Sequence, residues 1–113
     1  MESWKEARHL VKDIYAVFCG CKDLGFRDQI QRAAVSVMTN IAEGFDRGGN
    51  KEFIHFLTIA RGSLSEVKSL SYAALDIGYL QDNKVTLIQE RIIKLSNLIN
   101  GFIRYLNKTD RKK

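Results

Sequence analysis

The chain has 113 residues, 18 Lys and Arg against 13 Asp and Glu, two Cys, two His and no Pro. This length fits a single domain, and an apolar share of 45% beside 27% charged residues argues against disorder. No apolar run approaches the roughly 18 residues of a membrane span, and the N-terminus has no apolar signal segment. We therefore expect a cytoplasmic protein. With only two cysteines, one residue apart, the composition excludes a disulfide scaffold.

Four stretches carry apolar residues three and four positions apart, which is the pattern of an amphipathic helix facing a core. They cover residues 4–18, 26–41, 53–74 and 85–106. The last stretch is the most regular, because its apolar positions alternate between the two spacings from Val85 to Leu106 without interruption. Four amphipathic helices are therefore predicted.

Short glycine-containing turns separate the four stretches, so consecutive helices are expected to be antiparallel neighbours. Asn50 and Asp82 are expected to cap the third and fourth helices by accepting hydrogen bonds from amides of the first turn. The sequence predicts an all-α fold, an antiparallel up-down-up-down four-helix bundle. We place the bundle domain at residues 1–107 and a basic C-terminal tail at 108–113.

Further apolar residues lie beside the core positions. Leu87, Leu98 and Tyr105 share a side strip of the fourth helix, while Ile59 and Met38 lie off the stripes of the third and second helices. We hypothesise that these residues form the interface of a homo-oligomer. The alternative is a broad core stripe with a few scattered surface apolar residues.

The excess of positive charge is concentrated in residues 81–113, which hold eight Lys and Arg against three Asp and Glu. Such a localised basic surface predicts a partner rich in phosphate or another acidic group. The alternative is a solubilising helix face followed by a frayed basic tail. The candidate nucleic-acid contacts are, as first choice, Lys84, Arg91, Lys94, Arg104, Arg111, Lys112 and Lys113, and, as second choice, Arg32, Arg47 and Lys51.

The chain contains the residue types of a di-metal carboxylate centre, because it has two Glu-x-x-His motifs and two further glutamates. The set consists of Glu6, His9, Glu43, Glu52, His55 and Glu90. At about 100° per residue, both histidines and Glu90 fall far from the apolar stripes of their helices, so these ligands cannot meet inside one bundle. No metal and no cofactor are expected.

Other catalytic motifs also fail. The stretch from Gly44 to Lys51 has spacing like a P-loop, but it lacks Ser or Thr after the lysine and follows a helix. A weaker possibility is that Arg47 and Lys51 hold a phosphate before the third helix, although a plain interhelical loop is the simpler interpretation. No Ser-His-Asp or Cys-His arrangement is convincing. The sequence therefore predicts a protein that is not an enzyme.

Two blocks of sequence carry a resemblance, Asn40-Ile-Ala-Glu-Gly44 and Phe53-Ile-His-Phe-Leu-Thr-Ile-Ala-Arg-Gly-Ser63. They resemble the four-helix-bundle family of proteins encoded in intervening sequences of bacterial 23S ribosomal RNA genes, and the resemblance covers nearly the whole chain. The accessory variability-determinant protein of diversity-generating retroelements is more distantly similar. The resemblance implies a barrel-like homopentamer, and the retroelement protein implies a basic ring that binds nucleic acid and a reverse transcriptase.

We therefore expect a non-enzymatic, oligomeric helical bundle that binds RNA or DNA, with RNA favoured, through phosphate contacts. Little base specificity is expected, because no platform of alternating aromatic and basic residues is present. The alternative is an assembly or adaptor protein that docks another protein, such as a reverse transcriptase, through Leu87, Leu98 and Tyr105. No membrane partner is expected.

Overall fold

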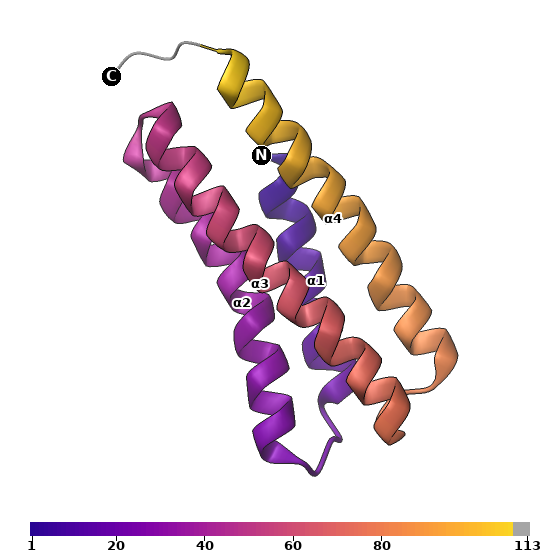
Figure 1. Cartoon of the computed structure of the whole chain (residues 1–113). Helices are drawn as coiled ribbons and strands as arrows, with labels where there is room; N and C mark the ends of the chain where they lie inside the picture. The colour runs from indigo at the N-terminus through magenta and orange to yellow at the C-terminus, as the bar shows by residue number, and fades with distance from the viewer. Residues whose placement is uncertain (110–113) are drawn as a thin grey trace.

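A computed structural model describes residues 1–109 and confirms the four-helix bundle. The helices are α1 (Glu2–Phe18), α2 (Leu24–Arg47), α3 (Asn50–Ile77) and α4 (Asp82–Lys108). Each helix packs against two neighbours, so that α1 and α3 lie on one diagonal of the bundle and α2 and α4 on the other (Figure 1). The bundle is a rod with principal extents of 49 × 21 × 18 Å.

The buried side chains largely follow the predicted stripes. On α4, six of the seven predicted core residues are buried, and Phe102 packs against them while remaining partly exposed. The apolar spacing predicts a stripe through Trp4, Ala7, Val11, Ile14 and Phe18 on α1. In the structure Leu10, outside that stripe, is fully buried, whereas Trp4 and Val11 are half-buried. Glu6 is buried on the same helix, where it pairs with Lys94 of α4, and Trp4 and Val11 still pack against the core.

Two predicted helix caps are wrong. Asn50 and Asp82 are the first residues inside α3 and α4, and the cap positions belong to Gly49 and Gln81. The Asn50 side chain instead donates hydrogen bonds to the carbonyl oxygens of Leu106, at 3.0 Å, and Thr109. Because the last carbonyls of a helix have no partner within that helix, this side chain stabilises the end of α4.

The segments that carry the family resemblance form much of the contact between α2 and α3. Gly44 is buried, and a Cβ atom at this position would lie 2.8 Å from the Cβ of Phe56 and 2.9 Å from Cδ1 of Phe53. Only glycine therefore permits this close approach of the two helices. Further along the same contact, the hydroxyls of Ser36 and Ser63 are hydrogen-bonded at 2.9 Å.

None of the helices in residues 1–109 combines the length and the apolar character that crossing a membrane requires. Helix α4 continues through Lys108, one residue past the expected end of the bundle domain. Arg111, Lys112 and Lys113 lie outside the described residues.

Candidate nucleic-acid interface

Two of the predicted phosphate contacts, Arg91 and Lys94, form ion pairs with α1. The Nζ of Lys94 lies 3.1 Å from one carboxylate oxygen of Glu6, and Nη1 of Arg91 lies 3.5 Å from the other. Arg91 also donates from Nε to Asp13 at 2.7 Å. Glu6 and Asp13 are seven residues apart and so share one side of α1. This α1/α4 ion-pair cluster holds two positive and two negative charges.

The neighbouring groups favour the ionised forms of Glu6 and Arg91. The hydrogen bond from Lys94 lowers the pKa of Glu6, and the two cations outweigh the opposing effect of burial. The hydrogen bond to Asp13 raises the pKa of Arg91. The ion pairs of Arg91 and Lys94 hold α1 against α4. Because the charges of the cluster balance, these two residues add no net positive charge to the surface.

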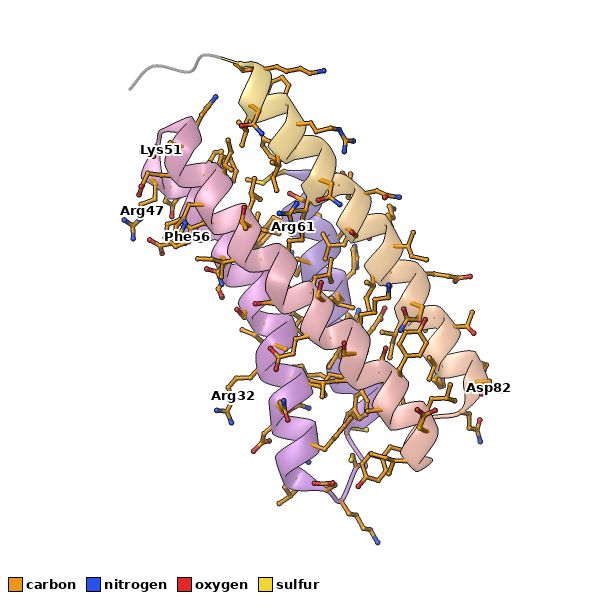
Figure 2. All side chains as sticks on the ribbon, viewed as in Figure 1. Arg32, Arg47, Lys51, Phe56, Arg61 and Asp82 are labelled. Atoms are coloured by element: carbon orange, nitrogen blue, oxygen red, sulfur yellow. The ribbon has the colours of Figure 1, made fainter. Side chains whose placement is uncertain are left out.

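Arg47 is also tied to neighbouring side chains. Its Nε lies 2.9 Å from a carboxylate oxygen of Glu43, and its Nη1 lies 3.8 Å from Glu52. The guanidinium carbon lies 5.0 Å from the ring centroid of Phe56, within the range of a cation–π contact. Figure 2 shows Arg47 and Phe56 side by side near one end of the bundle. Arg47 therefore belongs to the α2/α3 contact, together with two carboxylates.

The other predicted cations with described positions are exposed. Arg32, Lys51, Lys84 and Arg104 form no ion pair with any residue in 1–109. Arg32 projects outward from α2 in Figure 2, on the opposite side of the bundle from α4. The predicted contacts thus do not lie on one continuous surface.

Two cations outside the predicted set, Arg61 and Lys68, line a hollow of about 220 Å³ between α3 and α4. Ser65 lines it from the same helix, because spacings of four and three residues place all three side chains on one face. Ser96 and Asn97 line it from α4. In the sequence, the spacing of seven residues shows that Arg61 and Lys68 share one side of their helix. It does not show which helix packs beside them, so the hollow could not be predicted from it.

Positive charge without carboxylate partners accumulates on α3 and α4. From Arg91 to its end at Lys108, α4 contains no acidic residue. Six exposed cations on these two helices form no ion pair within the described chain. One of them, Lys84, lies at the opposite end of α4. We call the other five the α3/α4 basic surface: Lys51, Arg61, Lys68, Arg104 and Lys108. The start of α3 lies beside the end of α4, because Asn50 bonds the Leu106 carbonyl, so these residues occupy one end and the middle of the bundle.

The predicted interface residues differ in exposure. Leu87, Tyr105 and Ile59 are exposed, Tyr105 by 60%, whereas Leu98 and Met38 are partly buried. Other apolar residues outside the predicted interface are also exposed. They are Tyr72 and Ile93, which line a second hollow between α3 and α4, and Leu24, Phe45, Ile77 and Tyr79.

The groups that could perform catalysis lie apart. His9 and His55 are exposed on the diagonal helices α1 and α3. Cys19 and Cys21 are free thiols beyond the end of α1. Within residues 1–109, no group of three His, Cys, Asp or Glu side chains is arranged to hold a metal ion.

The sequence model of the 23S rRNA-intervening sequence protein family matches residues 1–101, and the chain belongs to this family. Among solved structures, the fold is similar to a protein with unknown function from the S23 ribosomal protein family of Bacteroides thetaiotaomicron. The TM-score is 0.78 at 21% sequence identity, and the similarity covers 89% of this chain and 94% of the other. No curated protein matches the sequence.

Proposed function

We propose that this protein is a non-enzymatic, homo-oligomeric helical bundle that binds nucleic acid, with RNA favoured, through backbone phosphates. The observation that carries the proposal is the asymmetry of charge around α4. On the side facing α1, Arg91 and Lys94 are neutralised by carboxylates, whereas the α3/α4 basic surface has no such partners in the described chain. Unpaired surface cations supply the electrostatic attraction on which phosphate binding depends.

Self-association would strengthen this attraction. Leu87, Tyr105 and Ile59 offer exposed apolar surface for an interface. In the homopentamer that the family resemblance implies, the formal charge would reach about +25. The family name refers to ribosomal RNA, which makes structured RNA the first ligand to test.

The proposal is tested by fluorescence anisotropy of a labelled RNA hairpin, titrated with protein at several salt concentrations. We expect affinity to fall steeply with salt, and the slope to decrease by about 1.4–1.8 when two contacting cations are neutralised in Arg104→Gln/Lys108→Gln. The matched control is Lys5→Gln/Lys12→Gln, which removes the same charge from the exposed face of α1. Arg91 and Lys94 are left intact, because replacing them would also loosen α1.

If the wild-type protein shows no binding at low salt, the proposal is wrong. Equal slopes for the α4 variant and the α1 control would contradict the assignment to the α3/α4 basic surface. Duplex DNA of the same length, measured in parallel, decides whether RNA is preferred.

A second candidate function is an adaptor that docks another protein, such as a reverse transcriptase. Exposed Leu87 and Tyr105 favour it, because both lie on the same side of α4 and neither is needed to fill the core. Complex formation would then depend weakly on salt and would be lost in Tyr105→Asp, while Arg104→Gln/Lys108→Gln would have little effect.

A further inference from the structure

The hollow between α3 and α4 differs from the other basic positions because its polar groups converge. Arg61, Ser65 and Lys68 approach from α3, and Ser96 and Asn97 from α4. No Asp or Glu of the described chain lines it. The site therefore offers two positive charges, two hydroxyl donors and an amide around a space of about 220 Å³.

Arg61 is held in position without losing its charge. Its Nη1 donates to the side-chain oxygen of Asn100 at 3.0 Å, and Asn100 lies close to Ser96, with 3.5 Å between amide nitrogen and hydroxyl. An amide oxygen is a neutral partner, so the guanidinium keeps its full charge and further N–H donors for a ligand. A cation oriented before binding loses less side-chain entropy when an anion binds.

The surroundings favour an anion at this level of the bundle. Figure 2 shows Arg61 midway along α3, between Lys51 at one end and Asp82 near the other. Towards Asp82, the neighbouring hollow is lined by Asp82 and Glu90, which repel anions. Towards the opposite end lie Arg104 and Lys108. The apolar inner lining of the site includes Leu64 and Ile92, which are 2% and 3% exposed, so water there is restricted on one side.

We infer that this hollow is a phosphate-binding subsite that takes one backbone phosphate of the bound strand, with Arg61 and Lys68 supplying the charge. The serine hydroxyls and Asn97 donate to the phosphate oxygens, and Asn100 is a positioning residue that acts through Arg61. As a statement about RNA the inference rests on the proposed function, but binding of phosphate itself does not.

The first measurement is therefore a titration of ¹⁵N-labelled protein with inorganic phosphate, followed by heteronuclear NMR at constant ionic strength. We expect the amide signals of Ser65, Ser96 and Asn97 to shift and saturate in the millimolar range, with no such response to chloride. The double variant Arg61→Gln/Lys68→Gln should lose these shifts. Asn100→Ala, which changes no charge, should weaken binding about two- to fivefold, and Arg61→Lys should also weaken it, because the fork of donors is lost.

The second measurement compares the same double variant with Lys5→Gln/Lys12→Gln in binding a labelled single-stranded RNA. Because the subsite holds one phosphate, its loss should lower the salt slope by about 0.7 and the affinity about fivefold at 0.1 M salt. The α1 control should lose far less. Circular dichroism verifies that each variant is folded.

The outcomes separate the two proposals. If neither phosphate nor RNA binding responds to Arg61→Gln/Lys68→Gln while the wild type binds RNA, the subsite is wrong and the proposed function stands. If the wild type binds no nucleic acid but inorganic phosphate shifts the amide signals of the residues that line the hollow, the proposed function is wrong and the hollow is a site for a free phosphate group. If inorganic phosphate produces no saturating shift in the wild type, the inference is overturned.

Discussion

Replacing Glu6 by glutamine tests how α1 is held on α4. The Glu6 side chain is only 7% exposed, and it contacts both Arg91 and Lys94. Glutamine keeps the shape of the side chain but removes its charge. Breaking a deeply buried ion pair costs about 3–5 kcal/mol, whereas exposed pairs contribute about 0–1 kcal/mol. Because Arg91 and Lys94 are 32% and 59% exposed, water screens both cations. We therefore expect a loss of about 1–2 kcal/mol.

The assay is urea unfolding of wild type and Glu6→Gln at pH 7 and at equal protein concentration, because association would add to apparent stability. With a slope near 1–2 kcal/mol per M, the midpoint should fall by about 1 M without a change in slope. The pKa of Glu6 is lowered in the fold, chiefly by the hydrogen bond from Lys94. Its stabilising effect is therefore present above the ordinary glutamate pKa of about 4.3 and is lost as pH falls through the lower folded pKa.

The difference between the two proteins should consequently be full at pH 6–7 and should shrink below about pH 4. Glu90→Gln is the matched control, because Glu90 is exposed on α4 and forms no ion pair within residues 1–109. Equal midpoints for wild type and Glu6→Gln at pH 7 would refute the reasoning. A difference that persists undiminished at pH 3 would show that the destabilisation does not arise from losing the charge of Glu6.

Two further predictions concern packing and the helix ends. Gly44→Ala should destabilise the protein by about 1–3 kcal/mol, because the new methyl group would lie 2.8 Å from the Cβ of Phe56. Gly62→Ala should stabilise it by about 0.5–1 kcal/mol, because no atom lies within 4 Å of a Cβ there. Thermal unfolding measures both, and changes of the same sign would contradict the packing argument. Asn50→Ala should lower the free energy of unfolding by about 1 kcal/mol, since the carbonyl oxygen of Leu106 loses its donor. It should also speed amide hydrogen exchange in the last turn of α4. Unchanged exchange there would show that this hydrogen bond does not hold the helix end.

The core of the bundle was predictable, because apolar spacing reports which side of a helix avoids water whatever its neighbour is. On α4 the alternation from Val85 to Leu106 predicts the buried side chains with one partial exception, Phe102. The caps at Asn50 and Asp82 were not predictable in the same way. Both residue types suit a cap, but Gly49 and Gln81 occupy the cap positions, which left the Asn50 amide free to bond the end of α4.

The candidate site depended on information that a single helix does not contain. Arg91 and Lys94 are basic residues on a side strip, and nothing on α4 itself indicates that the neighbouring helix presents carboxylates. The spacing of seven residues between Glu6 and Asp13 on α1 is the sequence feature that places two carboxylates on one side of that helix, but it does not show that this side faces α4. Arg61 shows the opposite case, because its polar neighbours on α4 are one serine, Ser96, and the amides of Asn97 and Asn100, which leave its charge intact.

The sequence by itself determined the number of helices, their inner faces and their antiparallel order, because each of these follows from local periodicity and short connections. Only the tertiary structure decided which cations remain available to a ligand. The physical reason is that the net effect of a charge depends on the groups within a few ångströms of it, and those groups come from a different helix. Lys94 and Lys68 are alike in the sequence, yet one is paired with a buried glutamate and the other lines a hollow without carboxylates.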